Sequence, residues 1–393
     1  MSRSDGRLAT VLAIAAAAVF VALSVGHPTP FDYFGRLAAA FWRGEWWLDD
    51  APPHLNELIV GAGGHRYSLV PPFPALLLVP LVPFFPTAVA QTTISAAVGG
   101  LSAGPLYLAQ RALAVPRGLA LWTALLSTFG TTLFVSAIDG RSWFAADAIA
   151  FACCAVALLF AARRAPPVLT GVALGAAVLT RAPLILCAPA LLALQLRGEP
   201  RRTAGRTVLW LGAGLLPFVA AYLAYDVMRW GTPFDVGYGT FAATDPFYSR
   251  GLFSVTYLPR QLYAIFFESP AFSDGDVMFL RARSVGLSVL FATPALLWIA
   301  RGAVVGTPLA RALVLGCLAL VPDLFFGTVG FEQYGYRRSL DAQAFLIPLV
   351  AVGGGWVEGR WLPSGTLLLR GAIVASIVIT AYFFVTIRMY GFA

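Results

Sequence analysis

Charged residues are scarce in this chain, and their scarcity decides the class of protein. Only 12% of the 393 residues are charged, whereas 59% are hydrophobic and the mean hydropathy is +0.78. Soluble domains carry about twice that charged fraction. Apolar runs recur along the chain at roughly the 20-residue length that a bilayer core requires. The composition therefore excludes a soluble globular protein and predicts an all-α, multi-pass membrane protein.

Lysine is absent and cysteine is rare. All 27 basic residues are arginines, and the net charge is +8. Short basic loops between membrane spans account for such a charge, so no nucleic-acid partner is expected. The four cysteines lie inside apolar runs without a CxxC spacing, which favours packing over a disulfide or a metal site.

Histidine is scarce too, and all three histidines fall in one stretch. His27, His54 and His65 lie within residues 27–87, the first long segment that is not a hydrophobic run. The same segment also contains Asp32, Asp49, Asp50, Glu57, Arg66 and Tyr67. A chain this apolar has little other reason to collect so much polar chemistry in one loop. We therefore interpret residues 27–87 as an external catalytic loop.

The arginines predict the orientation of the chain. Arg3 and Arg7 precede the first span, so the N-terminus is expected in the cytoplasm and the catalytic loop outside. The run 71–86 is broken by six prolines, which a straight span does not tolerate. A re-entrant or interfacial element there keeps Arg111 and Arg117 cytoplasmic. We expect a protein of the cell inner (plasma) membrane with its active site on the external or periplasmic side.

About eleven crossings are expected in a single membrane domain. Its parts are the first span 8–26, the external loop 27–87, a helical module 88–227, a second external loop 228–283, and the C-terminal spans 284–393. Apolar residues at helical spacing over 34–42 predict an amphipathic helix at the bilayer surface. A second short helix is expected over about 53–60.

Asp32 is the first candidate for catalysis. It lies a few residues beyond the first span, near the outer membrane surface. A carboxylate there suits a general base that takes a proton from an acceptor hydroxyl. Helix N-capping is an equally good explanation, because Asp precedes an amphipathic helix.

Asp49, Asp50, His54 and Glu57 form a tighter cluster. In a helix over 53–60, His54 and Glu57 would share one face. Carboxylates with an imidazole are metal ligands in principle. The spacing matches no strong zinc pattern, and the acidic pair is not DxD. A divalent metal is therefore possible but not favoured over a solvated turn.

Three arginines are candidates for phosphate binding. Arg181 sits between two short apolar runs, and charges at membrane depth are costly unless they are paired or functional. Arg337 and Arg338 are external, against the positive-inside trend, with Tyr336 beside them. The guanidinium fork suits a phosphate. Pairing of Arg181 with an aspartate, and of Arg337 and Arg338 with Glu332 and Asp341, are the competing structural explanations.

These features together resemble the GT-C superfamily of integral-membrane glycosyltransferases, and within it the ArnT/PMT-like enzymes (family 39 or RgtA-like). Asp32 is similar to the acidic residue of their first external loop, and Asp139 to an acidic residue of the second. The passage from Gly64 to Pro72 resembles the family's "y..kPPl" segment, but Val70 replaces the lysine. The pattern GxxLGxxxLTRxP at 171–183 is similar to another family segment.

The resemblance implies a GT-C-like fold and a bacterial cell-envelope enzyme that takes a sugar from a polyprenyl-phosphate donor, with inversion and without a metal. The acceptor would be a lipid, a glycan or a protein. Asp32 would be the base, Asp139 or Glu57 would orient the acceptor, and Arg181, Arg337 and Arg338 would hold the donor phosphate. A further set would contact substrate, namely Asp49, Asp50, His54, His65, Arg66, Tyr67 and Tyr336. A lipid-linked saccharide transporter or flippase and an inactive scaffold with this fold are the alternatives.

Overall fold

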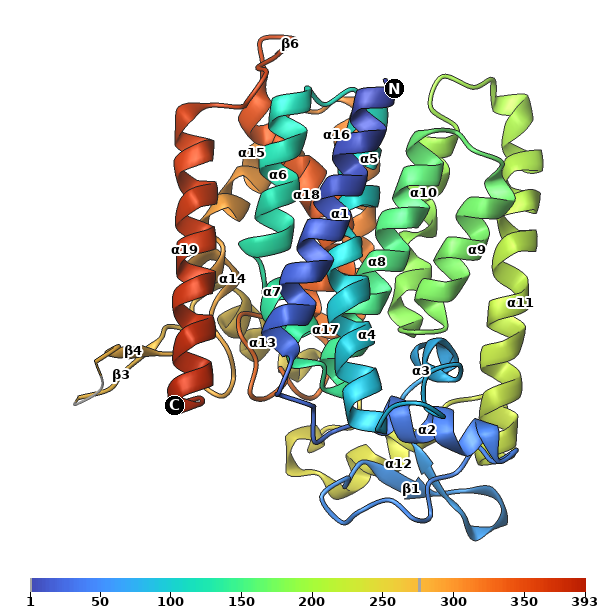
Figure 1. The fold of residues 1–393 in the computed structure, drawn as a ribbon. Helices are drawn as coiled ribbons and strands as arrows, with labels where there is room; N and C mark the ends of the chain where they lie inside the picture. Colours follow the sequence, from blue (N-terminus) through green and yellow to red (C-terminus); the bar gives the residue numbers. More distant parts are fainter. Residues whose placement is uncertain (1, 275–276) are drawn as a thin grey trace.

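The computed structural model describes residues 2–274 and 277–393, and these are mostly helical (Figure 1). Four helices are long and apolar enough to cross a bilayer, namely α1 (Arg3–Ser24), α8 (Ser142–Ala162), α11 (Ala204–Trp230) and α19 (Leu367–Tyr390). A fifth span results if α6 (Arg117–Phe129) and α7 (Thr132–Asp139), bent by 46°, act as one. The chain is therefore a helical membrane protein.

The expected number of about eleven crossings stays a prediction. Several expected spans are built from short pieces: 166–180 contains the 12-residue helix α9 (Pro167–Val178), and 182–196 contains a 3-10 turn followed by α10 (Ala188–Gln195). Besides α2 and α3, which are described below, the other α-helices of the described residues are α4 (Thr87–Leu101), α5 (Ala103–Ala112), α12 (Gly237–Thr244), α13 (Leu258–Phe266), α14 (Val289–Ala292), α15 (Trp298–Val304), α16 (Pro308–Leu315), α17 (Val321–Leu324) and α18 (Leu340–Gly355).

The centre of the bundle is formed by α8 and α18. Every residue of α18 is buried, as are most of α8, and both helices are rich in alanine. In contrast α1, α11 and α19 leave most of their apolar surface uncovered by protein. Apolar helix faces that protein does not cover are suited to contact lipid, so we place these three helices at the periphery of the bundle.

The two termini lie at opposite ends of the bundle (Figure 1). The N-terminal end also carries the hairpin of β5 (Trp356–Val357) and β6 (Arg360–Trp361). The other end carries α2 (Tyr33–Trp42), α3 (Phe73–Leu78), α12 and the first hairpin, of β1 (Leu58–Val60) and β2 (Arg66–Ser68). A third hairpin, of β3 (Ala271–Phe272) and β4 (Leu280–Arg281), projects from the side near the C-terminus.

The amphipathic helix expected over 34–42 is present as α2. Its residues Tyr33, Phe34 and Leu37 are buried, whereas Trp42 at its end is exposed and donates its indole N–H to the Val79 carbonyl beyond α3. The run 71–86 holds only the six-residue helix α3 before a series of turns. Six residues rise about 9 Å, so this segment contains no helix that could cross a bilayer.

The prediction of a helix over about 53–60 is wrong. Residues 58–60 instead form strand β1 (Leu58–Val60), which pairs antiparallel with β2 (Arg66–Ser68) in the register Leu58 to Ser68. The β-branched pair Ile59 and Val60 favours a strand, and Gly63 and Gly64 adopt positive φ angles of 69° and 79° in the turn. His54 and Glu57 therefore do not share a helix face.

Glycines allow α9 and α11 to pack closely. A Cβ atom on Gly171 would lie 2.0 Å from the Leu211 carbonyl oxygen, and one on Gly214 would lie 2.2 Å from the Val168 carbonyl oxygen. Small residues are what allow helix backbones in membranes to approach each other. The contact fixes the long peripheral helix α11 against the bundle.

We expect Gly214→Ala to lower the free energy of unfolding by about 1–3 kcal/mol, because the new methyl overlaps backbone of α9. Gly212→Ala is the matched control in the same helix, since a Cβ atom added there would meet nothing within 4 Å. That control should be neutral or stabilising by up to about 1 kcal/mol. Thermal unfolding of the two purified variants in detergent measures these changes. Equal melting temperatures for the two variants would contradict the close packing of α9 against α11.

Candidate functional site

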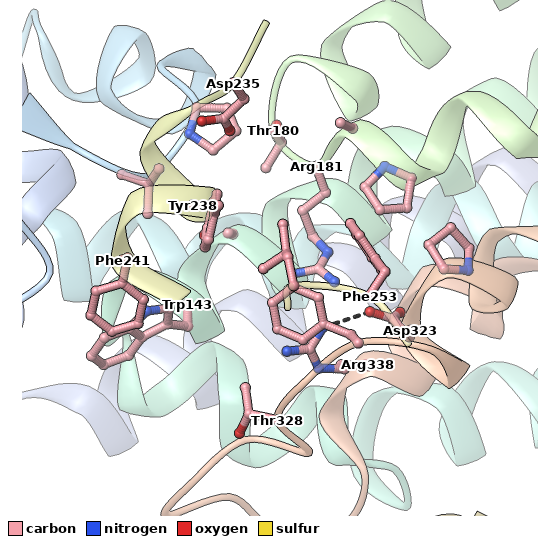
Figure 2. A pocket seen from close by; sticks show the side chains of 18 of the residues that line it. Trp143, Thr180, Arg181, Asp235, Tyr238, Phe241, Phe253, Asp323, Thr328 and Arg338 are labelled. Atoms are coloured by element: carbon pink, nitrogen blue, oxygen red, sulfur yellow. Dashed lines mark hydrogen bonds and ion pairs between the residues drawn. The ribbon is translucent and has the colours of Figure 1, made fainter. Parts of the chain in front are cut away.

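A cavity of about 540 Å³ lies at the end of the bundle that carries α2 and α12. Its lining comes from segments far apart in the sequence, which meet only in the fold. The polar and charged lining residues are Glu57, Trp143, Thr180, Arg181, Tyr222, Asp235, Tyr238, Tyr248, Asp323, Thr328, Arg337 and Arg338. Figure 2 labels several of them, among them Arg181, Asp323 and Arg338. The sequence-predicted residues Glu57, Arg181, Arg337 and Arg338 are thus brought together here.

Arg181 follows α9 and is held by two aspartates. Its Nε and Nη2 donate to the two carboxylate oxygens of Asp341 at 2.7 and 2.8 Å, in a bidentate pair. Its Nη1 lies 2.8 Å from Oδ1 of Asp147, close enough for an ion pair but poorly aligned for a hydrogen bond. All three guanidinium nitrogens are occupied, as the competing structural explanation for Arg181 proposed.

Arg337 and Arg338 are less completely engaged. Arg337 Nη1 donates to Oδ2 of Asp147 at 2.8 Å, and Arg338 Nη1 donates to Oδ1 of Asp323 at 2.6 Å, the pair that Figure 2 marks with a dashed line. The Arg338 guanidinium also lies 4.2 Å from the centre of the Phe326 ring. Neither partner is Glu332 or Asp341, as the sequence had suggested. The Nε–H groups of both arginines have no acceptor within the described chain.

The charges of this network balance, because three arginines face three aspartates. Asp147, Asp323 and Asp341 are all almost completely buried. Breaking one partner of a buried pair leaves an uncompensated charge, which is strongly destabilising. The pairing lets the cavity hold arginines inside an apolar bundle, and the Nη2 groups of Arg337 and Arg338, which make no hydrogen bond within the described chain, remain available to an anionic oxygen.

Glu57 is a cavity carboxylate that has no ion pair among the described residues. It precedes β1, and its Oε2 accepts a hydrogen bond of 2.7 Å from the Trp143 indole N–H. Its backbone N–H donates to the Tyr33 hydroxyl oxygen at 3.0 Å. Burial raises the pKa of Glu57, and the Trp143 hydrogen bond and the charge of Arg337 oppose that rise. A buried carboxylate with a raised pKa is suited to accept a proton.

Asp235 is a second cavity carboxylate without an ion pair in the described chain. It lies in the link between α11 and α12, where its Oδ1 accepts from the Gly237 backbone N–H at 3.2 Å. Burial raises its pKa, and the charge of Arg229 opposes the shift. With Tyr222, Tyr238 and Thr180 it makes part of the lining rich in hydroxyl groups.

Asp32 does not line the cavity. Its carboxylate accepts from Arg36 Nε at 2.7 Å and from the Thr87 hydroxyl at 2.5 Å, and the residue is only 2% exposed. It occupies the N-cap position of α2 without making a capping hydrogen bond. Asp32 therefore ties α2 to the start of α4, and its role as a catalytic base stays a prediction.

The other sequence-predicted residues also lie off the cavity. Asp139 pairs with Arg141 at 3.1 Å, and Tyr336 donates its hydroxyl to Gln261 at 2.9 Å. His65 stacks on Trp47 and lies 2.5 Å from Asp49, while His54 Nε2 lies 3.0 Å from the Pro30 carbonyl oxygen. Further contacts of these residues join Arg43 to Asp50, Arg66 to Asp49, and the buried Tyr67 to the Ala62 carbonyl.

Buried polar contacts from α11 support the hairpin of β1 and β2. Arg229, fully buried, donates from Nη1 to the Ser68 carbonyl at 2.6 Å and from Nη2 to Asp226 at 2.5 Å. This links α11 to β2 and so to the strand beside Glu57. No three His, Cys, Asp or Glu side chains in residues 2–274 and 277–393 form a group that could hold a metal ion.

Sequence reasoning missed Asp323 and Asp235 as members of the site. Asp323 is a single carboxylate within an apolar run, a pattern that indicates a paired or functional group inside a membrane protein. Asp235 lay in a loop that gave no sign of its place in space. Comparison with known proteins finds no matching protein-family model, curated protein or solved structure.

Arg181→Gln should lower the free energy of unfolding by about 3–5 kcal/mol, because it leaves Asp341 and Asp147 without their shared cation. Arg338→Gln removes the partner of one carboxylate, Asp323, so a smaller loss is expected. Chemical or thermal unfolding in detergent compares the two variants directly. A larger loss for Arg338→Gln would contradict the assignment of Arg181 as the main structural arginine.

Proposed function

We propose that this protein is a membrane glycosyltransferase that takes a sugar from a polyprenyl-phosphate donor and passes it to a lipid, glycan or protein acceptor. The observation that carries the proposal is the cavity itself, in which arginines with spare N–H groups and a carboxylate without an ion pair share one apolar enclosure. A sugar phosphate needs a cationic partner for its leaving group and a base for the acceptor.

The rim of the cavity supports a lipid-linked donor. Ile185, Leu186 and Phe253 line it and are 41%, 36% and 55% exposed. Apolar side chains exposed at the edge of a membrane protein suit contact with a hydrocarbon chain. We propose that the donor's phosphate and sugar enter the cavity while its polyprenyl chain stays among these residues and the surrounding lipid.

In this mechanism an acceptor hydroxyl attacks the anomeric carbon, and the bond from that carbon to the phosphate oxygen breaks. Glu57 takes the hydroxyl proton, so the polyprenyl phosphate leaves with the electron pair of the broken bond. Arg337 and Arg338 stabilise the charge that grows on the leaving oxygen. Arg181 acts as a positioning residue, because its donors already hold Asp147 and Asp341.

Glu57 replaces Asp32 as the proposed base. Asp32 is closed off by Arg36 and Thr87, whereas Glu57 faces the cavity and keeps one carboxylate oxygen without a hydrogen bond to the described chain. Asp235 lies in the same cavity and is suited to accept hydrogen bonds from sugar hydroxyls.

Glu57→Gln should reduce turnover of the donor by about 10²–10⁴-fold, the usual contribution of a general base. The amide oxygen of glutamine can still accept from Trp143, so folding should be preserved. The assay follows release of polyprenyl phosphate by purified protein from a panel of polyprenyl-phosphate hexoses and pentoses.

Asp32→Asn is the comparison variant for that assay. It should retain most of the turnover if Glu57 is the base, whereas loss in Asp32→Asn alone would return that role to Asp32. Donor binding without turnover in the wild-type protein, with every acceptor class supplied, would instead favour a transporter or flippase.

The pH dependence of kcat/KM should show an acidic limb above the ordinary glutamate pKa of about 4.3. Glu57 must be ionised to accept a proton, and burial raises its pKa. Activity should therefore rise with pH through the raised pKa and fall about tenfold per unit below it. The residual activity of Glu57→Gln should lack this limb, and an unchanged limb would assign the titration to another group.

A further inference from the structure

A groove of about 440 Å³ lies at the end of the bundle opposite the cavity (Figure 1). One wall is formed by residues 166–168, where α9 begins, and the other by Thr203, Arg206, Thr207 and Trp210. These four positions follow the spacing i, i+3, i+4 and i+7, so they form one face of the first turns of α11. The groove combines apolar walls with one charged side chain.

Arginines surround this groove. The described side chains of the two links that border it include Arg163, Arg164, Arg197 and Arg202, with Glu199 as the acidic residue among them, and Arg206 follows in the first turn of α11. Glu199 lies 3.3 Å from Arg164 Nη1, and neither Arg202 nor Arg206 forms an ion pair within the described chain. Burial and the positive charge of Arg164 lower the pKa of Arg197, so like charges are crowded here.

The groove also lies on the lipid-facing side of the bundle. Val208, Leu209 and Trp210 are 50%, 68% and 48% exposed, on the helix that the rest of the protein covers least. Tryptophan is enriched where headgroups meet hydrocarbon, and basic residues beyond it reach the headgroups. The glycine contacts of α9 with α11 hold both walls together.

We propose that this groove binds an anionic phospholipid, a site independent of the glycosyltransferase cavity. The headgroup phosphate lies against Arg206 and Arg202, and an acyl chain runs along the prolines, Val168 and Trp210. Charge complementarity selects the anionic headgroup, since basic pockets between membrane helices attract such lipids. The apolar walls select a lipid over a free phosphate ion, which gains nothing from them.

The test uses the full-length protein in bilayers of phosphatidylcholine with a fifth of phosphatidylglycerol. Native mass spectrometry after extraction counts the phosphatidylglycerol molecules retained and gives an apparent affinity. The double variant Arg202→Gln/Arg206→Gln should weaken that affinity about fivefold for each arginine, and so about twenty-five-fold in total. Trp210→Ala should weaken retention of phosphatidylglycerol with all arginines present.

The matched control is Arg311→Gln/Arg360→Gln, which removes two exposed arginines near α16 and β6 at the same end of the bundle. It should retain the lipid like the wild-type protein. An equal loss in this control would overturn the proposal, because general surface charge would then explain binding. Displacement of the lipid by millimolar inorganic phosphate, or unchanged retention in Trp210→Ala, would overturn it as well, since either result removes the acyl chain from the site.

Discussion

The pairing of charges inside an apolar bundle is the constraint on which this structure depends. Arg181 joins Asp147 of α8 to Asp341 of α18, the two helices that form the centre of the bundle. A single guanidinium thus fixes how the end of α9 meets both helices. In a low-dielectric surrounding none of these three charges is stable alone, so the arrangement is held as one unit.

That unit also shapes the chemistry of the cavity. Aspartates already balance the charges of the cavity's arginines. An anion that enters the cavity is therefore bound mainly by hydrogen bonds from unused N–H groups and less by attraction to a net positive charge. Glu57 lies outside the balance because it comes from the first loop and meets the network only through Trp143 and the field of Arg337. In the proposed mechanism, this balance of charge stabilises the leaving phosphate without binding it too tightly to release it.

The sequence predicted the features that depend on local composition. Apolar runs indicated a helical membrane protein, and periodicity located α2. The cost of a charge at membrane depth marked Arg181 for the site, and a departure from the positive-inside trend marked Arg337 and Arg338. The partners in long-range contacts could not be predicted from local sequence patterns. The contact of Asp32 with Thr87 joins residues 55 positions apart, and that of Arg181 with Asp341 joins residues 160 positions apart. The hairpin of β1 and β2, found where a helix was expected over 53–60, was also missed. The turn at Gly63 and Gly64 determines the local structure there, and the short polar pattern before it does not.

Arginine takes different roles at the two ends of the molecule because its surroundings differ. At the cavity end each arginine of the network is nearly buried, and the desolvated charge requires a carboxylate beside it. At the opposite end Arg202 and Arg206 are exposed, water screens their charges, and no carboxylate has to accompany them. Because no carboxylate is paired with Arg202 or Arg206, both can pair with lipid phosphates beside the apolar groove at the membrane surface. The scarcity of acidic residues at that end is therefore what makes it a surface for anionic lipid.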